Sequence, residues 1–133
     1  MGGSSTTLHE DPADLSTMTR DVHRALVSLQ EELEAVDWYR QRADACRDAE
    51  LREILLHNMR EEIEHAAMVL EWLRRRDPDF QEHLSTYLFA EGSILEAEEA
   101  ATSGTADGEA PPAETPAAET SAGLTLGSLK GDH

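Results

Sequence analysis

The sequence has few of the features that mark secreted or membrane-spanning proteins. Its single cysteine, Cys46, excludes an internal disulfide and suits a reducing compartment. No apolar run of about 18 residues or more occurs, and the first residues have neither the basic nor the apolar region of a secretory signal. We therefore expect a soluble cytoplasmic protein that neither crosses nor binds a membrane.

Basic residues are also scarce. The chain has 11 Lys and Arg against 28 Asp and Glu, which gives a formal net charge of −17. Such a charge repels phosphate backbones and anionic lipids, so nucleic acid is not expected as a partner. The same charge favours the binding of cations.

Aromatic residues make up only 5% of the chain, so its core must be small and aliphatic. A length of 133 residues leaves room for one domain. A single small core of this kind rarely stabilises a fold alone. We therefore expect the core to be completed by association with a further copy.

Composition divides the chain into four parts. Residues 1–13 are polar and expected to be disordered, whereas residues 14–101 have the periodicity of a helical domain. Residues 102–122 contain only Ala, Pro, Gly, Ser, Thr, Asp and Glu, so 102–123 is interpreted as a flexible acidic linker. Residues 124–131 turn apolar again.

The helical domain is predicted to be all-α, with two long helices at residues 14–45 and 49–76. Asp48 is expected to cap the second helix, and a link this short makes the two helices antiparallel. A shorter helix over 78–90 and a weak helical turn over 94–101 should follow. Apolar residues recur every three or four positions along the first helix: Leu15, Met18, Val22, Leu26, Leu29, Leu33 and Val36.

Glu62 and His65 form a Glu-x-x-His pair, which places both side chains on one helix face where they can bind one metal ion. Glu32 interrupts the apolar positions of the first helix. Buried carboxylates must be paired, hydrogen-bonded or metal-bound. The alternative to a metal is that Glu62 and His65 bond each other or an Arg. They share a face, expected to be buried, with Leu51, Leu55, Asn58, Val69, Trp72 and Leu73.

One Glu and one Glu-x-x-His are half of the usual ligand set of a di-iron helical bundle. Two hairpins packed face to face would supply the full set. We therefore expect a symmetric dimer, in which each hairpin is half of a four-helix bundle and the site lies at the two-fold interface.

The C-terminal apolar segment is too short to fold alone. Leu124, Leu126 and Leu129 follow a polar linker and are interpreted as anchors of a docking peptide that binds a groove on another protein.

These features together resemble the encapsulated ferritins. The likeness rests on Gln30–Tyr39, on Glu61–Met68 with the following Leu70–Arg75, and on the terminal segment, which is similar to the peptide that targets cargo to encapsulin shells. The resemblance implies a ring of dimers, a homodecamer, that acts as a ferroxidase on Fe²⁺ and dioxygen, with two iron ions per dimer interface. It also implies iron storage inside an encapsulin nanocompartment in the cytoplasm.

The resemblance also implies roles for individual residues. Glu32, Glu62 and His65 match the iron ligands, and Tyr39 matches a residue close to them that we expect to form hydrogen bonds there. It implies that the approach to the site is lined by Glu31, Glu34 and Trp38. It also implies that an outer cluster, which attracts metal ions, is formed by His57, Glu61 and Glu64. By spacing alone, that outer cluster is equally well a solvated acidic face.

The competing hypothesis is a non-catalytic dimeric adaptor or metal-binding cargo protein, in which the Glu/His cluster holds a structural ion. A rubrerythrin-like electron-transfer protein is disfavoured, because one cysteine cannot form the four-cysteine iron site of that group.

Overall fold

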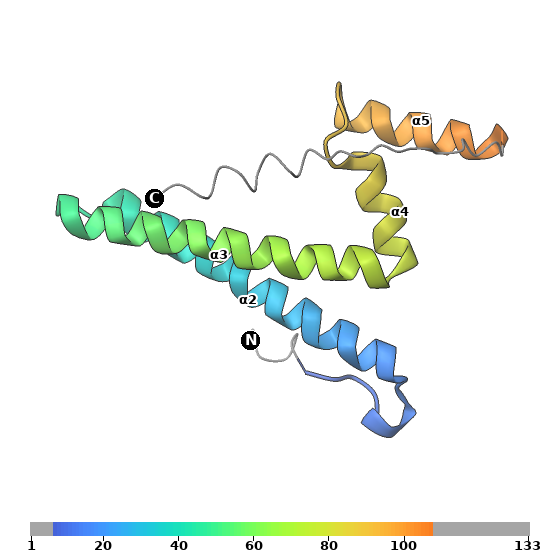
Figure 1. Cartoon of the computed structure of the whole chain (residues 1–133), viewed down its shortest axis with the longest axis horizontal. Coiled ribbons are helices and arrows are strands. Elements are labelled where there is room, and N and C mark those ends of the chain that lie inside the picture. Colours follow the sequence, from blue (N-terminus) through green and yellow to red (C-terminus); the bar gives the residue numbers. More distant parts are fainter. Residues whose placement is uncertain (1–6, 108–133) are drawn as a thin grey trace, which may run out of the picture. The chain divides into compact units, whose positions relative to one another are not determined.

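The structure, a computed structural model, describes residues 7–107, and every regular element in that range is helical. A 3-10 helix η1 (Pro12–Asp14) precedes α2 (Thr17–Ala45), α3 (Ala49–Arg76), α4 (Pro78–Tyr87) and α5 (Ile94–Asp107). Helices α2 and α3 run side by side in opposite directions, and α4 turns away from the end of α3 (Figure 1). The predicted all-α class with an antiparallel hairpin and a short third helix is confirmed.

The chain forms two compact units, and the boundary lies after Leu88. The first unit contains η1, α2, α3 and α4, and therefore all of the predicted metal ligands. Helix α5 belongs to the second unit. None of the described helices is both long and apolar enough to cross a membrane.

Short polar side chains fix where the long helices begin. The Asp48 carboxylate accepts the backbone N–H of Leu51 at 2.9 Å, as the sequence predicted for this cap. The first long helix begins at Thr17 and not at residue 14. Ser16 caps it there, and the preceding residues form the separate turn η1, which is capped by Asp11.

The other helix ends also differ from the prediction. Helix α4 ends at Tyr87, before the expected residue 90, because Phe89 has a left-handed backbone with φ 63° that cannot continue the helix. Helix α5 continues to Asp107 and so extends into residues 102–123, the segment interpreted as a linker. Residues 102–107 contain no proline, so no residue in the first part of that segment blocks the continuation of the helix.

The core of the hairpin is narrow. Only Ala43 on α2 and Met59, Ala66 and Leu73 on α3 are buried, and the last three recur at steps of seven residues. This heptad spacing keeps one stripe of α3 against α2 along its length. Small residues at two of the four positions allow the helices to approach closely.

The face of α3 that was expected to be buried is therefore only partly covered in a single chain. Leu73 is fully buried, but Leu51 is 48% exposed and the rest of that face is half-buried. The buried residues of α3 are Met59, Ala66 and Leu73, and of these only Leu73 belongs to the expected face. The stripe along which α3 packs on α2, called the seam below, therefore overlaps that face only in part. The apolar positions predicted for α2 include Met18 and Leu33, which are likewise exposed.

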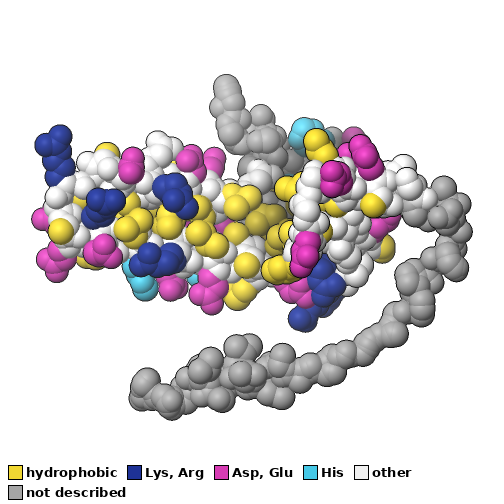
Figure 2. Space-filling view, turned by 90° about the horizontal axis from the view of Figure 1, so that it is seen from above, with side chains coloured by type: hydrophobic (Ala, Val, Ile, Leu, Met, Phe, Trp, Pro, Cys, Tyr) yellow, Lys and Arg dark blue, Asp and Glu magenta, His cyan; other side chains and the backbone are white. Residues whose placement is uncertain are grey.

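Much apolar surface remains on the hairpin. Hydrophobic side chains form a band along one face of the unit, with charged side chains along the edges (Figure 2). The exposed large hydrophobic residues of α2 and α3 are Met18, Leu33, Trp38, Leu51, Ile54, Ile63 and Met68.

Candidate metal centre

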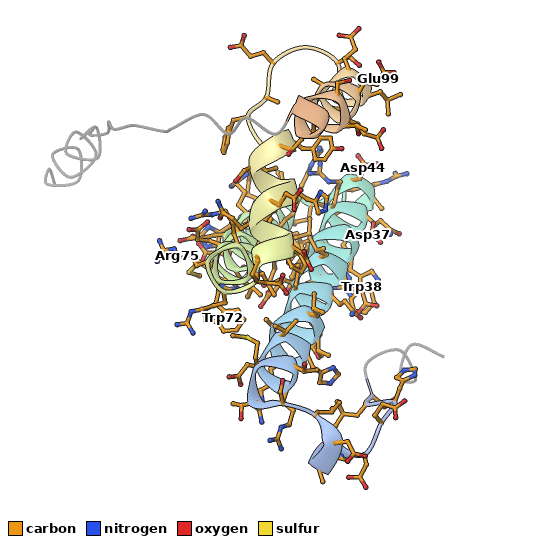
Figure 3. All side chains as sticks on the ribbon, turned by 90° about the vertical axis from the view of Figure 1, so that its right-hand side faces the viewer. Asp37, Trp38, Asp44, Trp72, Arg75 and Glu99 are labelled. Atoms are coloured by element: carbon orange, nitrogen blue, oxygen red, sulfur yellow. The ribbon has the colours of Figure 1, made fainter. Side chains whose placement is uncertain are left out.

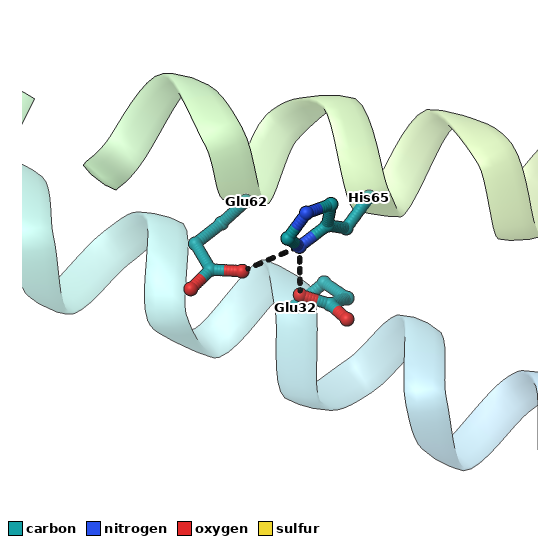
Figure 4. A group of neighbouring side chains, drawn as sticks. All are labelled: Glu32, Glu62 and His65. Carbon is teal, nitrogen blue, oxygen red and sulfur yellow. Dashed lines mark hydrogen bonds and ion pairs between the residues drawn. The ribbon is translucent and has the colours of Figure 1, made fainter. Parts of the chain in front are cut away.

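Glu32 on α2 meets Glu62 and His65 on α3 near the middle of the hairpin. The Nδ1 atom of His65 lies 3.1 Å from Oε1 of Glu62 and 3.5 Å from Oε1 of Glu32 (Figure 4). One ligand atom from each residue lies within 4.8 Å of the others. In the described part of the chain, this is the only group of three or more acidic, His or Cys side chains close enough to hold one metal ion.

Heptad spacing explains why the two carboxylates meet. Glu62 comes three residues after buried Met59 and four before buried Ala66, so it occupies the second seam position of its heptad. Glu32 comes eleven residues, or one heptad and four residues, before buried Ala43 on α2. Glu32 therefore occupies on α2 the heptad position that Glu62 occupies on α3. Each helix thus directs a carboxylate, where an apolar residue would normally pack, toward its neighbour.

Two side chains of the cluster, Glu32 and His65, have raised pKa values. Hydrogen bonding with the Glu62 carboxyl, burial, and the charge of Glu62 raise the pKa of Glu32, against a smaller lowering effect of His65. The hydrogen bond with Glu62 also raises the pKa of His65, although desolvation opposes this change. Glu32 and His65 therefore bind protons in competition with a divalent cation, because metal ligands must be deprotonated.

The donor set fits a first-row transition metal. Two carboxylates and one imidazole offer oxygen and nitrogen ligands of the kind that iron binds in helical bundles. Three ligand groups leave coordination positions unfilled. The side chains are 23% exposed for Glu62, 27% for Glu32 and 43% for His65, so the open side of the cluster faces outward.

The residues expected around the site are distributed along the same helices. Trp38 projects from α2 and is 48% exposed (Figure 3), and Glu31 and Glu34 are exposed beside it. The Arg42 guanidinium lies 5.5 Å from the centre of the Tyr39 ring. In the described part of the chain, no hydrogen bond joins Tyr39 to the cluster, so its role there stays a prediction.

The outer cluster is only partly assembled. Nε2 of His57 lies 3.8 Å from Oε2 of Glu61, and both side chains are at least half exposed. Glu64 faces a different hollow, which it shares with Glu71 and Arg75. The anchors of the predicted docking peptide, Leu124, Leu126 and Leu129, lie outside the described residues.

Two features were not predicted from the sequence. An ion-pair network ties Glu71 to Arg74 and Arg75 at 2.7 and 2.6 Å, and hydrogen bonds with both guanidinium groups lower the pKa of Glu71 to about 2. The i+3 and i+4 spacing of these residues was the available signal. The second feature is a groove of about 430 Å³, lined by Asp21, Arg24, Ala25, Ser28, Met68, Val69 and Trp72.

Comparison with known proteins gives a consistent result. The profile of the EncFtn-like family matches residues 7–91. An encapsulated ferritin-like protein from Rhodospirillum rubrum is 52% identical over 132 residues, which is 99% of this chain and 94% of that protein. A ferritin-like protein from Thermotoga maritima is 52% identical over 96 residues, 72% of this chain and 84% of its own length.

A solved structure is also similar. The crystal structure of protein ne0167 from Nitrosomonas europaea has a TM-score of 0.63 and 57% sequence identity. The match covers 65% of this chain and 96% of that one. The shared part is therefore almost the whole of the solved protein.

Proposed function

The chain belongs to the EncFtn-like family, and on this basis we propose that it is a ferroxidase, which oxidises Fe²⁺ to Fe³⁺ with dioxygen at a di-iron site shared by two copies of the chain. The observation that carries the proposal is the convergence of Glu32, Glu62 and His65, drawn from two helices, on one point of the hairpin. The three ligands are half of the set that a di-iron bundle uses.

The surroundings of the cluster support a shared site. Leu51 and Met68 lie on the side of the hairpin that carries the ligands, and they are 48% and 58% exposed. Apolar surface next to a half-complete ligand set is what a symmetric partner would cover. In the proposed dimer, four carboxylates and two imidazoles surround two iron ions.

A second apolar surface supports assembly beyond a dimer. Leu33 and Ile63 are 54% and 44% exposed, and each is one residue beyond a ligand position, on the other side of the seam. A dimer formed through the ligand side would leave these residues uncovered. We therefore keep the ring of dimers, a homodecamer, as part of the proposal.

In the proposed reaction, iron is the substrate. Two Fe²⁺ ions bind between the carboxylates, and each gives one electron to dioxygen, which takes up two protons and leaves as hydrogen peroxide. The two Fe³⁺ products hydrolyse and leave as precursors of a mineral. Glu32 and Glu62 hold the two ions close and balance their charge, and His65 supplies a nitrogen ligand after losing its proton. The protons released by the ligands are available to the reduced oxygen.

Storage requires a second component, because a ring of two-helix subunits encloses no cavity for a mineral. We propose that residues 124–131 bind an encapsulin shell, which supplies that space. The name of the Rhodospirillum rubrum relative supports this part of the proposal. Co-expression with a shell protein tests it: the full chain should be retained in the shell, and a chain that ends at residue 123 should not.

Anaerobic Fe²⁺ binding separates a ferroxidase from a passive metal-binding cargo protein. Two Fe²⁺ per dimer should bind with saturation, and His65→Ala should abolish that stoichiometry. Admission of oxygen should then oxidise the bound iron at once. Saturable binding without oxidation would favour the adaptor hypothesis, in which the ion is structural.

A further inference from the structure

The described part of the chain contains three methionines, which differ in exposure and in distance from the ligand cluster. Met68 is three residues after His65 on α3 and is 58% exposed. Met59 precedes the ligands of the same helix by one turn, but it is buried, at 7% exposure. Met18 is 45% exposed, but it lies about 20 Å from Glu32 along α2. Of these three, only Met68 is both exposed and next to the cluster.

The side chain of Met68 is directed toward the ligands. Long side chains of an α-helix lean toward its N-terminus, over the turn three or four residues before them. Met68 therefore leans over the turn that contains Glu64 and His65, and it shares a hollow with Glu64. Residues three apart on a helix have Cβ atoms about 5–6 Å apart. Met59 leans away from the ligands, because they follow it in the helix.

Open space borders Met68 on two sides. The groove of about 430 Å³ and a second hollow of about 470 Å³ are both lined by Met68 and Trp72. Hydrogen peroxide is little larger than water, whose share of liquid volume is about 30 Å³, so both spaces admit it. The cluster opens outward at His65, whose side chain is 43% exposed. A small product that leaves the cluster on this side therefore reaches the Met68 sulfur.

We propose that Met68 is a modification site, at which its thioether is oxidised to the sulfoxide by the hydrogen peroxide that the iron site releases. This inference rests on the proposed function, which supplies the oxidant. The sulfur attacks one oxygen of the peroxide, the O–O bond breaks, and the other oxygen leaves with both hydrogens as water. Sulfur loses two electrons and the peroxide gains them, so no further reactant is needed.

The proposed partner copy makes this reaction local. It covers Met68 from the bulk solvent and also encloses the peroxide that forms beside it. A reactant held next to its target has a much higher effective concentration than the same reactant in solution. The preferred target should therefore depend on the source of the peroxide. Met68 should react before Met18 during iron oxidation, and this preference should be absent when peroxide is added to the solution.

The reaction also protects the neighbouring aromatic residue. Peroxide that meets further Fe²⁺ yields hydroxyl radicals, which attack indole rings. Along α3, Met68 lies between His65 and Trp72. Oxidation of the thioether consumes the peroxide without forming a radical, and the sulfoxide can be reduced again by methionine sulfoxide reductases. A thioether at this position is therefore a renewable acceptor for the oxygen atom.

Peptide mass spectrometry after iron oxidation in air tests the inference. The full chain receives several equivalents of Fe²⁺ together with catalase, which destroys peroxide that reaches the solution. Met68 sulfoxide should exceed Met18 sulfoxide by more than about tenfold, and Met59 should stay unmodified. In metal-free protein treated with added hydrogen peroxide and no catalase, this excess should be lost. The same excess in both samples would overturn the proposal, because Met68 would then be selected whatever the source of the peroxide.

Two variants sharpen the result. His65→Ala should lose the Met68 sulfoxide together with iron oxidation, and equal sulfoxide in this variant would overturn the proposal, because iron in solution would then be the source. Met68→Leu keeps the apolar volume and should oxidise Fe²⁺ at the unmodified rate. Without catalase, this variant should release more peroxide, by the amount of sulfoxide that the unmodified chain forms. Unchanged release, or oxidised Trp72 in place of the sulfoxide in the unmodified chain, would contradict the proposal.

The two proposals fail in different ways. Rapid iron oxidation that leaves Met68 unmodified would refute this inference and leave the ferroxidase standing. Iron oxidation no faster than in buffer would refute the ferroxidase, and this inference with it.

Discussion

Truncation of Leu73 to alanine should destabilise the hairpin more than any other leucine replacement. Leu73 is the one large side chain that is fully buried in the described residues, at 0% exposure. Leu→Ala at such a site costs about 2–4 kcal/mol, because transfer energy is lost and a cavity remains. For a unit of this size the melting temperature should fall by roughly 10–25 °C.

The assay is thermal and urea unfolding of the full chain, followed by circular dichroism at 222 nm. Leu33→Ala is the matched control, because the same atoms are removed from a side chain that is 54% exposed. In a single chain it should cost about 0.5 kcal/mol or less. Any larger loss should grow with protein concentration, since it would then report on association through that side of the hairpin.

Equal destabilisation by both replacements at low concentration would refute the reasoning. It would mean that the seam marked by Met59, Ala66 and Leu73 is not where the hairpin is held together. A normal value of m, the dependence of unfolding free energy on urea, is needed for the comparison, because a changed value would indicate altered compactness of the unfolded or folded state.

Three further predictions concern single residues. The pKa of His65 is raised, so its protonated form stabilises the metal-free fold below about pH 6.5, and this contribution is lost as pH rises through the folded value. Glu62→Gln should lower that pKa in an NMR titration, and an unchanged midpoint would contradict the assigned cause. Glu71 should titrate near pH 2 by NMR, and its contribution to stability should be present above about pH 4.5 and decline as pH falls toward 2; a midpoint near 4.5 would show that its ion pairs do not form in solution. Asp48→Ala should cost about 1 kcal/mol in urea unfolding through loss of the helix cap, whereas Asp48→Asn should cost little.

Local rules predicted the hairpin well. The bounds of α3 follow from Asp48 as its cap and from Asp77-Pro78 after its last basic turn, because these signals act within a few residues. The start of α2 was harder to predict from the sequence, because Ser16 and Asp11 are both suitable helix caps and lie only a few residues apart. The end of α4 depends on the backbone of Phe89, which has no clear sequence signal.

The proximity of Glu32, Glu62 and His65 was predictable from spacing along the two helices, whereas their role as metal ligands stays a prediction. Glu62 and His65 meet through the i+3 relation, and Glu32 meets them because both helices keep heptad spacing. The burial of the face was not predictable in the same way. Periodicity shows which residues share a side of a helix, but it does not show whether the chain itself or a further copy covers that side.

The most direct test of the account is the initial rate of Fe²⁺ oxidation in air, followed by ferric absorbance, for the unmodified chain and its ligand variants. Glu32→Ala, Glu62→Ala and His65→Ala should each lower the rate in excess of buffer by more than about tenfold. Glu53→Ala, which removes an exposed carboxylate of the same helix as Glu62, should leave it unchanged. The account is contradicted if the unmodified chain oxidises iron no faster than buffer, or if the ligand variants retain its rate.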